Sequence, residues 1–180
     1  MLEQHLEFLV ERSVVAIPQA RVGLGLIIAV GFSFSLAHVF SLMANRLKPR
    51  QILVHVILDS LVLAAALLIG SCLNLLMIAL VTNRVIEPHV FFNATGGALT
   101  PGLFYVLVAA PYISDLIAIV IWVLVHLNVV TLIHLRFGLP YEQVLLITAP
   151  GYVLTLVMVA LVFRQSWRRS YLRLASALKS

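Results

Sequence analysis

Charged side chains are scarce in this chain. They make up 11% of its 180 residues, against about 25% in ordinary soluble domains, whereas 62% of the residues are hydrophobic. A soluble core of this size does not need so much apolar surface. The composition therefore excludes a water-soluble domain and predicts an integral membrane protein, with room for four or five helices of about 20 apolar residues each.

Cysteine and recognisable catalytic motifs are missing as well. Cys72 is the only cysteine, which excludes an internal disulfide and the paired-cysteine motifs of zinc and redox sites. The sequence contains no GxSxG serine motif, no HExxH zinc motif and no histidine cluster of the kind that binds two irons. We therefore expect neither an enzyme nor a metal site. The net charge of +5 does not indicate nucleic-acid binding, because the basic residues flank apolar runs as they do in membrane proteins.

Four apolar runs are long enough to cross a bilayer. They cover residues 22–44, 52–81, 112–135 and 143–163, with basic residues or turn-forming proline and glycine near their ends. The sequence thus predicts an all-α, polytopic transmembrane helical bundle in a single domain. Ahead of the first run, residues 2–17 have the apolar face and acidic stripe of an amphipathic helix, which favours contact with a protein over contact with anionic lipid alone.

Residues 90–111 are the ambiguous part of the chain. The stretch "NATGGALTPG" contains glycines and a proline and is expected to be non-helical, while the apolar "LFYVLVAAP" that follows is too short to cross. In a four-span interpretation this segment dips into the bilayer or lies at its surface. In a five-span interpretation residues 103–135 cross twice. Both place eight of the twelve Lys and Arg residues, including the tail, in the cytoplasm. Two crossings would have about 16 residues each, below the usual range, so we favour four spans.

Ionisable residues inside the apolar runs need an explanation, because they are costly in a bilayer. The four strongest candidates are His38, Asp59, Asp115 and His126. The simplest interpretation is that they make helix–helix contacts, within this protein or with a partner subunit. A second interpretation is a transport path lined by Asp59, Asp115 and His126, with 90–111 as a re-entrant element. A third is binding of haem or chlorophyll, with His38 and His126 as axial ligands.

Small and polar residues recur at helical spacing in the first two runs, as Gly31, Ser35, His38 and Asn45 in the first and Ser60, Ala64, Ser71 and Asn74 in the second. Such stripes let membrane helices approach closely and form hydrogen bonds. We expect the helices to pack through them. His38 and Asp59 both lie about two turns from the 45–51 connection, so we also expect them to be close to each other.

Residues 164–180 form a basic tail with an aromatic anchor, and the candidate contact residues are Arg164, Trp167, Arg168, Arg169, Tyr171 and Arg173. A basic amphipathic helix of this kind would lie on anionic lipid headgroups, gaining about 1 kcal/mol for each basic residue near the surface. Two alternatives are simple anchoring of the last span and docking of an acidic cytoplasmic partner.

The segment "HLRFGLPYEQVLLITAPGYVLTLVMVALVF", residues 134–163, carries Gly138, Gln143, Pro150, Gly151 and Tyr152 in a short Gly-containing connection and an apolar helix with a Tyr/Pro break. In this respect it resembles bacterial members of the Yip1-domain family. The chain lacks the DLYGP-type motif of eukaryotic members and a fifth span after residue 163. The resemblance implies a non-enzymatic polytopic protein linked to membrane organisation or trafficking, and it transfers no catalytic residue.

The sequence thus predicts a non-enzymatic membrane protein that acts as a subunit, assembly factor or scaffold of a larger membrane complex. Its expected partners are the lipid bilayer, other membrane subunits and anionic headgroups at the tail, with no nucleic acid and no required cofactor. A transporter or channel component is the alternative function, and a haem- or chlorophyll-carrying subunit is the third.

Overall fold

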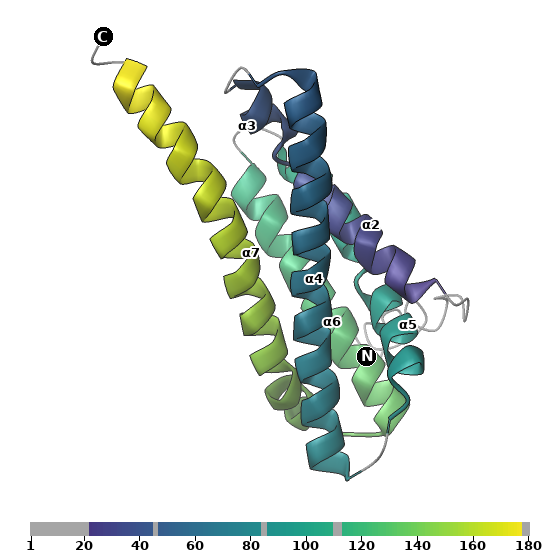
Figure 1. Cartoon of the computed structure of the whole chain (residues 1–180). Coiled ribbons are helices and arrows are strands. Elements are labelled where there is room, and N and C mark those ends of the chain that lie inside the picture. Colours follow the sequence, from purple (N-terminus) through teal and green to yellow (C-terminus); the bar gives the residue numbers. More distant parts are fainter. Residues whose placement is uncertain (1–21, 45–46, 84–85, 110–112, 178–180) are drawn as a thin grey trace.

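Helices account for all the regular structure in the described part of the chain (Figure 1). The computed structural model describes residues 22–44, 47–83, 86–109 and 113–177, with the backbone alone for Phe40, Ser41, Ala44 and residues 165–177. The elements are α2 Gly23–Leu36, α3 Val39–Ala44, α4 Pro49–Thr82, α5 Pro88–Ala98, the 3₁₀ helix η1 Thr100–Ala109, α6 Ser114–Phe137 and α7 Tyr141–Ala177. The predicted all-α bundle is confirmed. The amphipathic helix predicted at 2–17 lies outside the described residues.

Three helices in the described part are long and apolar enough to cross a bilayer. They are α4, α6 and the Tyr141–Arg164 part of α7, and the bent pair α5–η1 makes a fourth if it is taken as one span. Their outward faces carry large apolar side chains, among them Leu58, Leu61, Leu80, Leu116 and Leu146. So much exposed apolar surface is unsuited to water and suited to lipid. The protein is therefore an integral membrane protein.

α2 and α4 form an antiparallel hairpin. Gly31 lies so close to α4 that a Cβ at this position would sit 2.7 Å from Ser60 O and 2.8 Å from Ala64 N. One turn later in α2, the Ser35 hydroxyl donates a 2.9 Å hydrogen bond to Val56 O, one turn earlier in α4. Gly31 of the first stripe therefore packs against Ser60 and Ala64 of the second, whereas Asn74 of the second stripe lies against α7.

The later helices continue the alternation of direction (Figure 1). A Cβ at Gly70 of α4 would collide with Thr155 of α7. One turn further along α4, Asn74 lies against Gly151, one turn earlier in α7. α7 is therefore antiparallel to α4. It is also antiparallel to α6, to which it is joined by a short turn at 138–140.

α5 and η1 together run from one end of the bundle to the other (Figure 1). Along this path they lie parallel to α2. Near the start of α2, the Gly23 N–H donates a 3.1 Å hydrogen bond to Asn93 Oδ1 of α5. Further along, the Ser33 hydroxyl donates a 2.8 Å hydrogen bond to Leu103 O of η1. The pair enters at the end where α4 stops and leaves at the end where α6 starts, so it passes through the bundle and does not turn back.

The structure thus differs from the non-helical conformation expected for "NATGGALTPG" within 90–111. "NATGGA" belongs to α5, and the chain is helical from Pro88 onward. A 3₁₀ helix rises about 2.0 Å per residue against 1.5 Å in an α-helix, so α5 and η1 together cover roughly 35 Å, enough for a hydrocarbon core of about 30 Å. As a result, the 47–50 connection and the C-terminal end of α7 lie at the same end of the bundle (Figure 1).

The first predicted span, residues 22–44, is not one continuous helix. α2 ends at Leu36 and α3 begins at Val39. At the break the His38 N–H donates to Ser35 O, three residues back, as in the tightened last turn of a helix. With 14 residues, α2 is about 21 Å long, shorter than a hydrocarbon core of about 30 Å. Neither glycine nor proline marks the break. Hydrogen bonds from Ser33 to η1 and from Ser35 to α4 hold the C-terminal end of α2 in place.

Aromatic rings fill the centre of the bundle between α2, η1 and α6. The Phe34 side chain is completely buried, with 0% of its surface exposed. Its ring centroid lies 4.1 Å from that of Tyr105 and 5.2 Å from that of Trp122, the latter in an edge-to-face arrangement. Aromatic pairs at such separations are favourable beyond the area they bury. This cluster fixes η1 against its neighbours, although a long 3₁₀ helix is an uncommon conformation.

Candidate functional site

The structure separates the four ionisable residues predicted as a polar seam. No hydrogen bond or ion pair between described residues joins any two of His38, Asp59, Asp115 and His126. They lie on different helices or, for the two on α6, three turns apart. Each is therefore described by its own surroundings.

His38 lies at the break between α2 and α3, and its ring packs 4.0 Å from the ring of Phe163 in α7. Asp59 is half-buried on α4. The expected proximity of these two residues is wrong, because of the register of the hairpin. Ser35 pairs with Val56, so the next turn of α2 faces residues of α4 that precede Val56 and lie further from Asp59.

Asp115 and His126 do not form a continuous path along α6. Asp115 is exposed in the first turn, where a negative charge is favourable at the positive end of the helix dipole. His126 is half-buried deeper in the bundle, and Trp122 is buried between them. The spacing of eleven residues does place both on one side of the helix, as predicted. The two side chains are nevertheless three turns apart, too far to interact directly.

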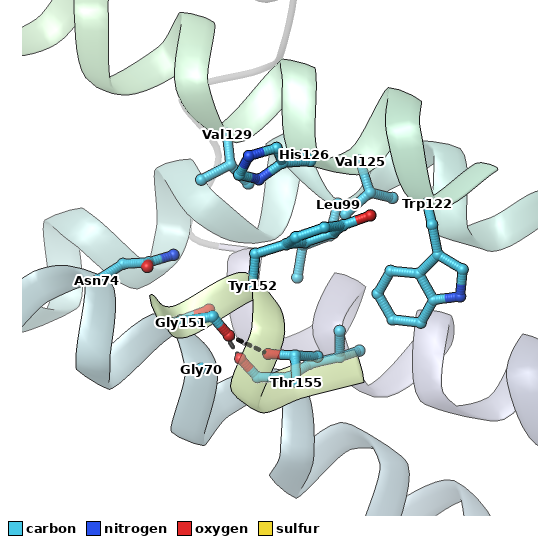
Figure 2. Close-up of a pocket in the computed structure, with 12 residues that line it drawn as sticks. Gly70, Asn74, Leu99, Trp122, Val125, His126, Val129, Gly151, Tyr152 and Thr155 are labelled. Atoms are coloured by element: carbon cyan, nitrogen blue, oxygen red, sulfur yellow. Dashed lines mark hydrogen bonds between the residues drawn. The ribbon is translucent and has the colours of Figure 1, made fainter. Parts of the chain in front are cut away.

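His126 belongs to a different constellation, which encloses a cavity of about 30 Å³ between α4, α6 and α7 (Figure 2). Its ring stacks on Tyr152 of α7 with 4.1 Å between centroids. Tyr152 in turn lies 6.2 Å from Trp122, edge to face. His126, Tyr152 and Asn74 line the cavity from α6, α7 and α4 respectively (Figure 2).

The cavity lies beside a close contact between α4 and α7. A Cβ at Gly151 would collide with Asn74 Oδ1 and sit 2.5 Å from Gly70 O, so only glycine fits there. Beside this contact the Thr155 hydroxyl donates a 2.8 Å hydrogen bond to Gly151 O. Two glycines thus bring the helix backbones together, and polar side chains gather at their contact.

The surroundings of His38 and His126 do not test the binding of haem or chlorophyll, which stays a prediction. The cavity beside His126 has about 30 Å³, whereas pockets that enclose sizeable ligands measure about 300–1,000 Å³. The His38 ring is stacked on Phe163. Across the described residues, no group of three or more His, Cys, Asp or Glu side chains converges as a metal site would require.

The tail continues the last span as one helix. α7 is helical to Ala177, and Figure 1 shows its C-terminal part leaning away from the other helices. Arg164 is exposed. The structure does not describe the side chains of the other predicted tail contacts, which are Trp167, Arg168, Arg169, Tyr171 and Arg173.

Sequence reasoning missed two parts of this arrangement. Ser33, which bonds η1 from both sides by donating to Leu103 O and accepting from Val106 N at 3.1 Å, did not stand out from the other serines. Thr155 was missed because nothing in the sequence indicates which residues of the last span face the second. Asn74 stood on a predicted polar stripe, and this was the available signal for the cavity.

Comparisons of the chain with protein-family models, with curated proteins and with solved structures find no match. The resemblance of residues 134–163 to the Yip1-domain family therefore stays a prediction.

Proposed function

We propose that this protein is a non-enzymatic subunit, assembly factor or scaffold of a larger membrane complex. The observation that carries the proposal is that α7 departs from the bundle toward its C-terminus (Figure 1). The helix has 37 residues and is about 55 Å long, against a hydrocarbon core of about 30 Å. Its C-terminal part therefore extends past the apolar Tyr141–Arg164 segment as an arm.

The chemistry of the arm favours an anionic partner. The sequence after Phe163 is "RQSWRRSYLRLASALKS", with five basic residues and no acidic one. Such a helix binds either anionic headgroups or an acidic protein surface, because each basic residue near a negative surface contributes about 1 kcal/mol. A helix that leaves its own bundle gains little from intramolecular packing, which favours a partner that covers it.

We also propose that the end of the bundle carrying the arm is cytoplasmic. Lys48, Arg50 and Arg164 are exposed at this end. Arg136 is at the opposite end with Glu87 and Glu142. An excess of Lys and Arg marks the cytoplasmic side of membrane proteins.

Asp115 supports a partner within the membrane. It is exposed on α6 although ionisable groups in spans normally face a bundle interior or a partner. A neighbouring subunit that covers the start of α6 would provide a polar contact for its carboxylate. This would be the helix–helix contact with a partner subunit that the sequence suggests for Asp115.

The test is gentle purification of the tagged full-length protein with identification of subunits that co-elute in fixed ratio. We expect a defined partner whose recovery falls at least tenfold in an Arg168→Glu, Arg169→Glu variant. Arg136→Glu, a charge reversal at the opposite end of the bundle, is the matched control and should leave recovery unchanged. Isolation of the wild-type protein alone, with no partner, would contradict the proposal.

Transport is the competing function. Variants of Asp115 and His126 distinguish a transporter from a scaffold. If the seam conducts, Asp115→Asn and His126→Ala each abolish flux in reconstituted vesicles while expression is unchanged. If the protein is a scaffold, Asp115→Asn reduces assembly with the partner.

A further inference from the structure

The cavity between α4, α6 and α7 contains a polar group that the packing of the helices leaves without a partner. Asn74 is 7% exposed, and its side chain lines the cavity (Figure 2). Among the described residues, no donor reaches its Oδ1 atom. Buried amide oxygens in folded proteins nearly always accept a hydrogen bond, from protein or from ordered water.

The hydroxyl groups beside Asn74 cannot supply that hydrogen bond. The Ser71 hydroxyl donates to Leu67 O at 2.8 Å, and the Thr155 hydroxyl donates to Gly151 O at 2.8 Å. Each hydroxyl has a single proton, which is committed to a helix carbonyl one turn back, so that only lone pairs remain toward the cavity. The group that fills this space must therefore be a hydrogen-bond donor.

Size and charge identify the donor. A water molecule needs about 10–15 Å³, so the 30 Å³ cavity has room for at least one. None of the residues that line it is an Asp or Glu. A cation there would be buried without a compensating charge, which is strongly unfavourable. A neutral donor of the size of water satisfies both conditions.

We propose that the cavity is a binding site for an ordered water molecule, which donates a hydrogen bond to Asn74 Oδ1 and links α4 to the His126–Tyr152 stack on α6 and α7. His126 and Thr155 line the same cavity and supply the further polar partners that a buried water requires. The water holds α7 to the bundle where Gly70 and Gly151 contribute no side chains to the packing.

The direct test is a high-resolution structure of the full-length protein in lipid nanodiscs. We expect a solvent peak at hydrogen-bonding distance, about 2.7–3.2 Å, from Asn74 Oδ1. A structure without that peak, in which the amide is rotated so that its nitrogen donates to the Gly70 carbonyl, would overturn the proposal.

Infrared spectroscopy provides a second readout. Spectra in H₂¹⁶O and H₂¹⁸O identify the O–H stretch of a buried water by its isotope shift. We expect such a band in the wild type and its loss in Asn74→Leu, which replaces the amide with an apolar group of similar size. Thr95→Val is the matched control, because Thr95 Oγ1 is also buried without a partner but does not line this cavity. A band that persists in Asn74→Leu, or that is lost in Thr95→Val alone, would contradict the assignment.

Discussion

Gly70 of α4 and Gly151 of α7 bring two membrane helices into backbone contact. A Cβ at Gly151 would sit 2.5 Å from Gly70 O, and one at Gly70 would sit 2.8 Å from Gly151 O. Close approach through small residues is the main way in which membrane helices associate, since lipid removes the hydrophobic drive between them. This contact fixes α7 antiparallel to α4.

Gly151→Ala should destabilise the protein by about 1–3 kcal/mol, because the added methyl group forces α4 and α7 apart. The measurement is thermal or denaturant unfolding in detergent. Gly25→Ala is the matched control, since a Cβ at Gly25 meets nothing within 4 Å. That variant should be neutral or gain up to about 1 kcal/mol from helix propensity. Equal losses in the two variants would show that the helices do not touch at Gly151.

Ser33→Ala should cost more stability than Ser35→Ala. The Ser33 hydroxyl donates to Leu103 O and accepts from the Val106 N–H at 3.1 Å, so its removal leaves a backbone donor of η1 without a partner. An unsatisfied buried group costs about 1–3 kcal/mol. Ser35 donates one hydrogen bond to Val56 O, a carbonyl within α4, and its loss should cost about 1 kcal/mol. Unfolding of the two variants side by side measures the difference, and the reverse order would show that η1 is not held by Ser33.

Asp115→Asn and His126→Ala should have independent effects on stability. The two residues are three turns apart on α6, and the buried Trp122 lies between them. Effects of distant, unconnected residues usually add to within about 0.5 kcal/mol. A double-mutant cycle measures their coupling. A coupling energy above about 1 kcal/mol would restore the polar seam.

Phe34→Ala should be among the most damaging substitutions in the protein. Phe34 is fully buried against Tyr105 and Trp122, and removal of such a ring costs about 3–5 kcal/mol. Phe104→Ala is the control, because that ring is 61% exposed beside the aromatic cluster. If both variants unfold alike, the cluster is not the core of the bundle.

Local patterns in the sequence predicted the contacts that depend on helical periodicity. The contact of Gly31 with Ser60 and Ala64 follows from small residues repeating every turn. The break at Ala37–His38 could not be found in this way. Neither glycine nor proline marks it, and the Ser35 hydroxyl bonds across to another helix that the sequence does not identify. Likewise, no local pattern pairs Asn74 with Gly151, which are far apart in the chain.

The conformation of residues 93–98 was predicted wrongly for a physical reason. Gly96 and Gly97 indicate a loop, because glycine is unfavourable within a helix by about 1 kcal/mol relative to alanine. In the structure Gly96 is inside α5, where a Cβ would collide with the backbone of Gly23. The glycine is there to let α5 touch α2. With residues 93–102 interpreted as a loop, only residues 103–111 remained as an apolar segment, which is too short to cross a bilayer.

The passage of α5–η1 through the bundle is tested most directly by the sidedness of two connections. In a Cys72→Ser background, single cysteines at Lys48, Gly138 and Ala177 can be labelled with a membrane-impermeant maleimide in sealed, oriented vesicles. The structure predicts that residues 48 and 177 react from the same side and residue 138 from the other. Reaction of 48 and 177 from opposite sides would contradict it and would restore a segment at 90–111 that does not cross.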